Sequence, residues 1–265
     1  MNAEMQIKSN THSATTQHQA SDAAYERTYN GEEYQENDNF GSDAAFQATI
    51  ERLIDKSKVI ELEKLDPAIA RSKPAYRFVK RAFDIASCSC ALVICAIPMA
   101  VIAILIKVDS PGPVFYKQER LGLNGKPFTL VKFRSMRVGA ESEGAQWACD
   151  QDDRMTKVGR VLRSTRLDEI PQFASVVTGK LSLIGPRPER KVFYDEFEKY
   201  IHGFSQRMLV KPGITGLAQV NGGYELLPEE KVVYDFEYIK NRSLTLDAKV
   251  VAKTFGVLFS REGAR

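Results

Sequence analysis

The pattern of apolar and polar positions divides the chain into a polar beginning and a more apolar remainder. Residues 1–47 are rich in Asn, Gln, Ser, Thr, Glu and Ala and show no sustained periodicity, so we expect them to be disordered. Between residues 44 and 65, apolar side chains recur at helical spacing and predict a short amphipathic helix (Phe46, Ile50, Leu53 and Ile54). Pro67 and Pro74 then indicate a linker.

A long uncharged run follows over residues 85–106 (IASCSCALVICAIPMAVIAILI). As one helix its 22 residues would extend about 33 Å, close to the thickness of a bilayer core. A single transmembrane helix is therefore one interpretation. Pro98 opposes a simple crossing, because proline removes a helix hydrogen bond and introduces a kink.

Basic residues flank this run on both sides, with five over residues 71–81 and seven over residues 107–137. Basic flanks favour the cytoplasmic side of a membrane. A helix–break–helix segment that enters and leaves by one face satisfies both flanks, with its break at Pro98. The charges thus slightly favour a re-entrant segment over a spanning one, and a buried core helix is the third alternative.

The remaining pattern predicts a mainly helical α+β domain over residues 76–265, preceded by a tail over residues 1–75. Two short strands joined by an Asn-Gly turn form a predicted hairpin (112–116, 128–133, with Asn124 and Gly125). Helices are predicted around a Gly-rich loop at residues 211–223 (158–180, 190–204, 228–240 and 244–260). The last of these has the pattern of a core helix or an interfacial amphipathic helix.

Charge is distributed unevenly along the chain. Residues 1–70 carry a balance of −7 and the remainder +10, within a formal net charge of +3. A basic body indicates an anionic partner such as phosphate, nucleic acid or a lipid surface. The four cysteines include no CxxC pair, and two of the three histidines lie in the polar tail. This excludes a His-rich metal site and argues against a disulfide scaffold or a zinc finger.

The candidate chemistry centres on the adjacent carboxylates Asp168 and Glu169, which follow Arg163 and Arg166 and precede Pro171. Taken alone, this segment has the composition of a helix end with a solvated basic face. Two adjacent acidic side chains with neighbouring cations also suit a site that holds Mg²⁺ and a nucleotide diphosphate.

Three further cations are candidate phosphate ligands. Arg187 lies between two prolines, whose stiff backbone would hold its guanidinium for bidentate phosphate binding. Lys132 and Arg134 would share one face of a strand. The alternatives are a rigid surface turn for Arg187 and a charged edge strand for the other two. Arg163 completes the set of expected phosphate-binding residues.

Six blocks in the same order resemble the bacterial sugar transferases, the monotopic polyprenol-phosphate phosphoglycosyl transferases. The blocks are KRAFD (80–84), GPVFYKQERLGLNGKPFTLVKFRSM (112–136), LRSTRLDEIPQ (162–172), SLIGPRPE (182–189), PGITGLAQVNG (212–222) and SLTLDAKVVAKT (243–254). The chain resembles the short form of that family, with an additional N-terminal tail that has no counterpart in the family pattern. Ile97 departs from the family pattern, where a serine often precedes the proline.

The resemblance implies an enzyme that moves sugar 1-phosphate from a UDP-sugar to undecaprenyl phosphate and releases UMP. Such a reaction initiates the assembly of a capsule, exopolysaccharide or O-antigen. It implies that Asp168 is the nucleophile, that Glu169 is its partner, that both carboxylates support Mg²⁺, and that Arg187 binds phosphate. It also implies a re-entrant segment in the bacterial inner membrane, with the enzyme on its cytoplasmic face, and no nucleic-acid partner.

Two other functions stay open at the level of sequence. A DxD-type glycosyltransferase acting on a lipid-linked sugar would use Asp150 and Asp152 and would release UDP. A non-catalytic membrane scaffold would use the basic surface to hold anionic lipid. The sequence leaves open the sugar, the polysaccharide, the role of the tail and the oligomeric state, with a homodimer among the options.

Overall fold

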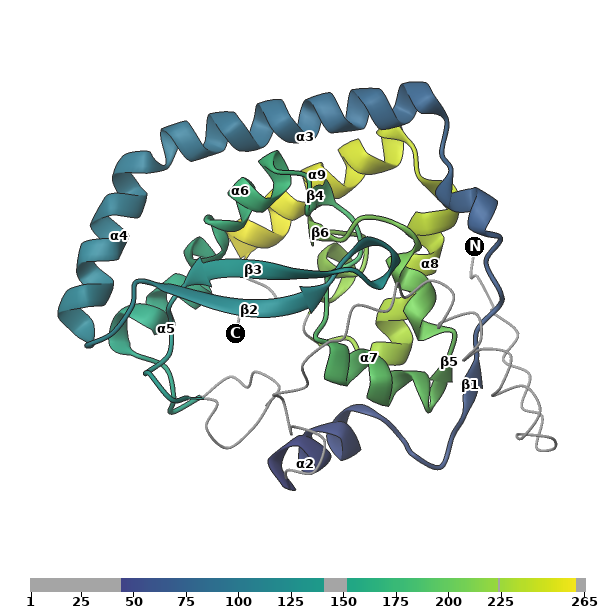
Figure 1. Ribbon diagram of the computed structural model, residues 1–265, viewed down its shortest axis with the longest axis horizontal. Helices are drawn as coiled ribbons and strands as arrows, with labels where there is room; N and C mark the ends of the chain where they lie inside the picture. The colour runs from purple at the N-terminus through teal and green to yellow at the C-terminus, as the bar shows by residue number, and fades with distance from the viewer. Residues whose placement is uncertain (1–43, 141–151, 224, 261–265) are drawn as a thin grey trace.

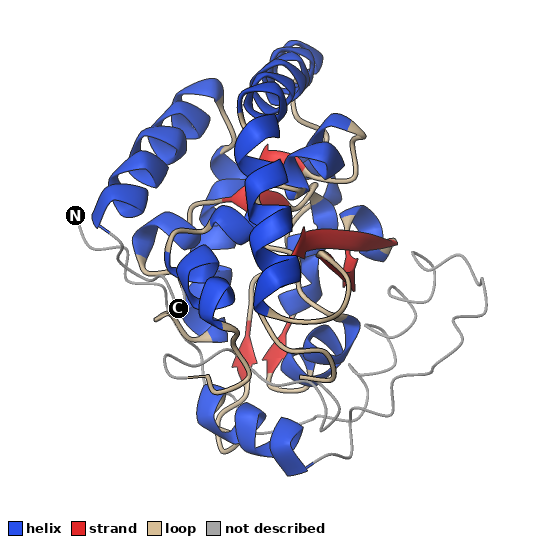
Figure 2. Ribbon diagram, turned by 90° about the vertical axis from the view of Figure 1, so that its left-hand side faces the viewer, coloured by secondary structure: helices blue, strands red, loops and turns tan. Residues whose placement is uncertain are grey.

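Helices dominate the fold and the strands are short, as Figure 1 and Figure 2 show. The computed structural model describes residues 44–140, 152–223 and 225–260. The helices are α2 (Ala44–Leu53), α3 (Pro74–Ile94), α4 (Ala96–Asp109), α5 (Lys157–Ser164), α6 (Gln172–Val177), α7 (Lys191–Glu198), α8 (Pro228–Asn241) and α9 (Leu244–Ser260). The prediction of a mainly helical fold with small strands is confirmed.

Three two-stranded sheets connect these helices. The pairs are parallel β1 (Ile60–Glu61) with β5 (Ile201–His202), antiparallel β2 (Phe115–Leu121) with β3 (Pro127–Phe133), and parallel β4 (Ser182–Ile184) with β6 (Gly213–Thr215). Short 3-10 helices complete the described chain: η2 (Pro67–Ala70), η3 (Leu123–Gly125), η4 (Leu167–Glu169), η5 (Phe204–Leu209) and η6 (Gln219–Asn221).

The predicted hairpin is confirmed as β2 and β3, but its first strand lies over residues 115–121 and not over 112–116. Asn124 has a φ of 56° and Gly125 a φ of 72°, so both adopt the left-handed conformation that asparagine and glycine tolerate best. The two strands pair in register from Phe115 opposite Phe133 to Leu121 opposite Pro127. This hairpin carries one wall of the functional site.

α3 and α4 form a long bent arm over one side of the molecule (Figure 1). The arm is tied down by polar contacts near its beginning. Asp84 accepts hydrogen bonds from Ser182 Oγ at 2.8 Å and from Leu183 N at 3.2 Å, and Arg81 donates to the carbonyls that end α6. These contacts fix the arm to β4 and α6.

The helix axis bends by 59° at Cys95, not at Pro98, where the sequence placed the break. α3 ends at Ile94, four residues before the proline. Because Pro98 has no N–H to donate to the Ile94 carbonyl, and its ring crowds that carbonyl, the hydrogen-bond ladder is interrupted there. Cys95 N and Met99 N still donate to carbonyls four residues earlier, at 2.8 Å each. Pro98 therefore accounts for a break that lies upstream of it.

Much of the apolar surface of this arm is exposed. Large hydrophobic side chains point away from the body along both helices (Phe78, Phe83, Val93, Ile94, Ile97, Ile104 and Val108). Among the described residues, no one helix has the length and apolarity needed to traverse a bilayer, whereas α3 and α4 taken together do. An exposed apolar surface of this kind is typical of a face that is covered by lipid or by another protein.

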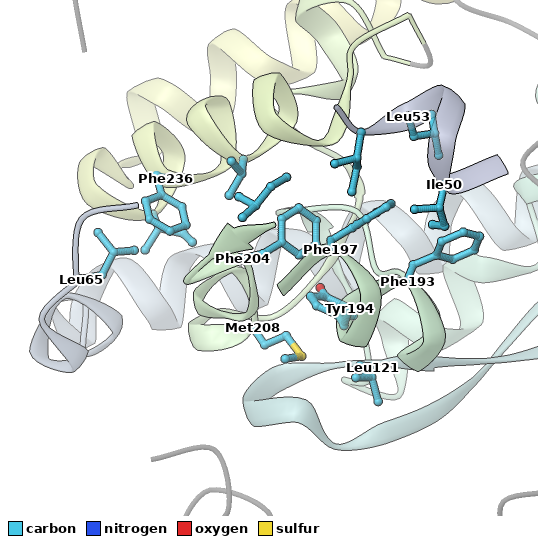
Figure 3. Close-up of a cluster of buried hydrophobic side chains, with 14 of the residues drawn as sticks. Ile50, Leu53, Leu65, Leu121, Phe193, Tyr194, Phe197, Phe204, Met208 and Phe236 are labelled. Atoms are coloured by element: carbon cyan, nitrogen blue, oxygen red, sulfur yellow. The ribbon is translucent and has the colours of Figure 1, made fainter. Parts of the chain in front are cut away.

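The largest core lies between α2, α7, η5 and α8 (Figure 3). The predicted amphipathic helix is confirmed as α2, which buries Phe46 and Ile50 against α7 with the Phe46 and Phe193 rings 5.5 Å apart. Phe197 meets Phe204 edge to face at 5.2 Å. The disorder expected over residues 1–47 is wrong for residues 44–47, which belong to α2, and residues 1–43 lie outside the described residues.

The single helix predicted over residues 158–180 is wrong. The chain forms α5, then η4, then α6, because Arg166 adopts a left-handed conformation with a φ of 58° and ends the first helix. The helix predicted over residues 190–204 ends at Glu198 and is followed by β5. The predicted helices over 228–240 and 244–260 are confirmed as α8 and α9.

Candidate active site

The break between α5 and α6 presents Asp168 to a cavity. Thr156 Oγ1 caps α5 by accepting from Gly159 N at 3.0 Å. Gly159 lies so close to the chain after β3 that a Cβ atom would stand 1.9 Å from Ser135 O, so only glycine fits there. The left-handed turn at Arg166 then redirects the chain, and Asp168 lines the cavity with 6 % of its surface exposed.

Glu169 is held by two cations from different elements. Arg187 Nη2 donates to Glu169 Oε1 at 2.5 Å, and Lys132 Nζ donates to the same oxygen at 3.3 Å. Lys132 comes from β3 and Arg187 from the chain after β4. Three of the residues predicted from the sequence are therefore brought together. No hydrogen bond from the described residues reaches Asp168, so its carboxylate is available for chemistry.

The two carboxyls have opposite pKa shifts. Burial raises the pKa of Asp168, and the neighbouring charge of Glu169 adds to the shift, so the value reaches about 6. Cations oppose this shift without reversing it (Lys132, Arg163 and Arg187). Burial acts on Glu169 in the same direction, but Arg187 and Lys132 hold its pKa well below the usual range. Glu169 therefore stays ionised, whereas the ionised form of Asp168 is destabilised by its surroundings and is the more reactive carboxylate.

The cavity has a volume of about 420 Å³ and a strongly positive lining. Eleven arginine and lysine side chains face two carboxylates, Asp168 and Glu189 (Arg120, Lys132, Arg134, Arg137, Arg154, Arg163, Arg166, Arg187, Arg190, Arg207 and Lys231). Low-dielectric walls lined by one sign of charge concentrate ligands of the opposite sign. The cavity therefore suits a ligand that carries several phosphates.

Arg187 is fixed through its backbone as well as by its neighbouring prolines. Arg207 Nη2 donates to Arg187 O at 3.1 Å, and Arg120 Nη1 donates to Pro188 O at 3.1 Å. Arg120 also bonds Glu189 Oε2 at 3.0 Å. The segment that carries Arg187 is thus held by side chains from η5 and from β2.

The model of the bacterial sugar transferase family matches residues 75–261, more than two thirds of the chain. This chain belongs to the bacterial sugar transferase family. The resemblance drawn from the six sequence blocks is therefore confirmed.

Curated relatives of this chain carry related names. A UDP-N-acetylgalactosamine-undecaprenyl-phosphate N-acetylgalactosaminephosphotransferase of Aeromonas hydrophila is 42% identical over 81% of this chain and 52% of its own length. A UDP-glucose:undecaprenyl-phosphate glucose-1-phosphate transferase of Escherichia coli is 42% identical over 67% and 39%. The enzyme of that name from Caulobacter vibrioides is 34% identical over 80% and 81%. The chain thus spans about half of the length of the first of these relatives and less than half of the length of the second.

Arg134 and Arg163, both predicted as phosphate ligands, have different surroundings in the structure. Arg134 is 4 % exposed, and its terminal nitrogens donate to Ser110 O at 2.7 Å and Pro111 O at 3.0 Å. It therefore fixes the chain between α4 and β2, and this geometry does not support it as a phosphate ligand. Arg163 lines the cavity, and its buried Nη1 has no hydrogen-bond partner among the described residues, which suits an anion site.

The donor set of this site fits Mg²⁺. No group of three or more His, Cys, Asp or Glu side chains that could enclose a metal occurs within residues 44–140, 152–223 and 225–260. Mg²⁺ does not need one, because it is usually held by one or two carboxylates together with substrate phosphates and water. Asp168 and Glu169 supply that number. In the alternative DxD motif, Arg154 binds both carboxylate oxygens of Asp152, which leaves that carboxylate less suited to a metal. Asp150, the other acidic residue of the motif, lies outside the described residues.

Sequence reasoning missed the ion pair beneath the cavity. Arg207 Nε donates to Asp235 Oδ2 at 2.6 Å, and both side chains are almost fully buried. The Arg207 guanidinium also lies 4.7 Å from the centre of the Phe204 ring. The two charges come from η5 and α8, separated by 28 positions. No local motif links them.

Proposed function

We propose that this chain transfers a sugar 1-phosphate from a UDP-sugar to undecaprenyl phosphate and releases UMP. The transfer would initiate the assembly of an exopolysaccharide, capsule or O-antigen. The observation that carries the proposal is one unpaired, buried carboxylate, Asp168, at the wall of a cavity lined by eleven cations. The names of the relatives support both substrates.

In the first step an Asp168 oxygen attacks the phosphorus that carries the sugar. The new bond joins this oxygen to phosphorus, and the bond from that phosphorus to the bridging oxygen breaks. UMP leaves with the electron pair of the broken bond. In the second step an oxygen of undecaprenyl phosphate attacks the same phosphorus, and the Asp168 carboxylate leaves. A nucleophile used in this way divides one transfer into two easier ones.

The side chains around Asp168 lower the barrier by electrostatics. A carboxylate that approaches a diphosphate is repelled by it, and fixed cations cancel that repulsion without reorganisation. Arg187 and Lys132, both held by Glu169, stay in place while phosphates enter and leave. Mg²⁺ bound by Asp168 and Glu169 would neutralise further negative charge on the phosphate oxygens.

The α3–α4 arm would lie in the cytoplasmic leaflet of the bacterial inner membrane as a re-entrant segment. The 59° bend and the exposed apolar side chains of both helices support this placement. α9 adds exposed Phe255 and Leu258 and is tied to α3, since Lys80 Nζ and Tyr76 OH donate to Asp247. These helices would set the cavity at the depth of lipid phosphates.

Topology labelling tests the re-entrant placement. Single cysteines introduced at Lys73 and Lys117, in a background without native cysteines, flank the arm on either side. In intact inner-membrane vesicles, both positions should react with a membrane-impermeant maleimide only when the cytoplasmic face is exposed. Reaction of the two positions from opposite faces would show a spanning helix and overturn the placement.

One assay separates the proposed activity from its alternatives. Purified protein is incubated with a panel of UDP-sugars, Mg²⁺ and undecaprenyl phosphate, and the released nucleotide is identified. We expect UMP and a lipid-linked sugar diphosphate. Release of UDP would indicate a glycosyltransferase, and release of neither would indicate a scaffold. The panel also identifies the sugar.

A further inference from the structure

The cavity runs lengthwise along the β2–β3 hairpin, and its two ends differ in chemistry. The open end of the hairpin lies towards α4 and α5, and its turn lies towards α8 (Figure 1). At the open end, Phe115 faces Phe133 across the strands, and the next pair is Tyr116 and Lys132. Arg120, which bonds Glu189, lies four residues farther along β2, about 13 Å at about 3.3 Å per residue.

The reacting carboxylates are near the open end. Lys132 binds Glu169 directly, and its side chain lies on the opposite face of the hairpin from the Phe115–Phe133 pair. The cavity reaches around this end of the hairpin, because Phe115 lines it together with Lys132 and Asp168, and a long cationic stretch follows on the other side. That stretch ends at Arg207 and Lys231, below the hairpin turn.

The open end is lined by exposed apolar side chains. Pro113, Phe115 and Val138 all line the cavity, and Phe115 and Val138 keep 42 % and 67 % of their surface exposed. Val138 rests on Gly112, because a Cβ atom on that glycine would stand 2.6 Å from Val138 Cγ2. Exposed aliphatic side chains at a cavity entrance are unfavourable in water and favour an apolar ligand.

This apolar end lies beside the end of α4. α4 ends at Asp109, only four residues before Pro113, and Val114 packs on the buried face of α4. On the opposite face, Leu105 and Val108 are 47 % and 80 % exposed. Exposed apolar side chains therefore occur both on the outer face of α4 and, a few residues later in the chain, at the open end of the cavity.

We propose that the apolar end of the cavity, formed by Pro113, Phe115 and Val138, is the binding subsite for the polyprenyl chain of the acceptor. The inference rests on the proposed function and adds the direction from which each substrate enters. The isoprenoid chain leaves its phosphate over the apolar end and continues along α4 into the bilayer. The nucleotide occupies the cationic end, where Arg120, Arg190, Arg207 and Lys231 line the cavity.

The test uses Val138, since its exposed side chain contributes little to folding. In Val138→Asp a charged group stands in the path of the chain, so we expect the KM for undecaprenyl phosphate to rise at least about tenfold. The near-isosteric Val138→Thr should give a smaller rise in the same KM. The first half-reaction needs no lipid. Formation of labelled enzyme from a UDP-sugar labelled in the sugar should therefore be unchanged in both variants.

Val59→Asp is the matched control, because Val59 is 55 % exposed and does not line the cavity. Assays in detergent micelles remove any effect of membrane attachment. An unchanged KM for undecaprenyl phosphate in Val138→Asp would overturn the subsite. So would a loss of the first half-reaction, which would place the nucleotide at this end. If the wild-type enzyme forms neither labelled protein nor UMP, the proposed function itself fails and the subsite with it.

Discussion

Asp168→Asn should reduce sugar-phosphate transfer by at least about 10³-fold, because an amide cannot form the acyl phosphate that the two-step reaction requires. The cavity would keep its cations and Glu169 would keep both partners, so substrates should still bind. The measurement is UMP release under saturating UDP-sugar, with and without undecaprenyl phosphate. Both rates should fall together, since both depend on the same first step.

Loss of folding does not explain this expected result. Burial and Glu169 raise the pKa of Asp168 to about 6 in the folded protein, above the ordinary value of 3.8. At pH 7 the folded state therefore bears the cost of an ionised, poorly solvated carboxylate, and stability falls as the pH rises from about 4 through 6. The Asp168→Asn variant, which is neutral at this position, should melt no lower than wild type at pH 7.

A surface aspartate supplies the matched control for this substitution. Asp195 lies on α7, pairs with Lys191 at 2.7 Å and does not line the cavity. Asp195→Asn should keep wild-type activity. Transfer by Asp168→Asn at a rate close to that of the control would remove Asp168 from the role of nucleophile.

Asp235→Asn should lower the free energy of unfolding by about 3–5 kcal/mol, the usual effect of removing one partner of a buried ion pair. Arg207 would keep its charge in a site where its side chain is 2 % exposed, with no carboxylate at hydrogen-bond distance. Because Arg207 also bonds Arg187 O, the cavity wall should loosen and activity should fall with stability. Thermal and denaturant unfolding in detergent measure the first effect.

An exposed ion pair provides the comparison. Glu51 and Lys56 are 3.3 Å apart on α2 and its following turn, and both are solvent-accessible. Glu51→Gln should leave the unfolding midpoint nearly unchanged, since exposed pairs contribute little. Equal midpoints for Asp235→Asn and Glu51→Gln would show that the buried pair does not support the fold.

Local signals in the sequence predicted the parts of the site that depend on neighbouring residues. The Asn124–Gly125 turn fixed the hairpin and thereby the position of Lys132. The carboxylate pair was visible as a pair, and the prolines around Arg187 drew attention to a segment that the structure brings to Glu169. In each case the residues that determine the structure are adjacent in the chain.

Features that depend on distant contacts could not be predicted in this way. β4 and β6 are three residues long, and they pair only because the chain around Gly185 and Gly213 approaches closely. The left-handed Arg166 has no glycine or asparagine to signal it. Arg134 has the sequence context of a phosphate ligand, but the carbonyls of Ser110 and Pro111 engage it. Tertiary contacts decide all three.

The most direct test of the central claim is the mass of the enzyme after incubation with a UDP-sugar and Mg²⁺ in the absence of lipid. Rapid quenching in acid followed by peptide mass spectrometry should find one sugar phosphate on the peptide that contains Asp168, and undecaprenyl phosphate should remove it. UMP release with no adduct on that peptide, or with the adduct on another residue, would contradict the claim.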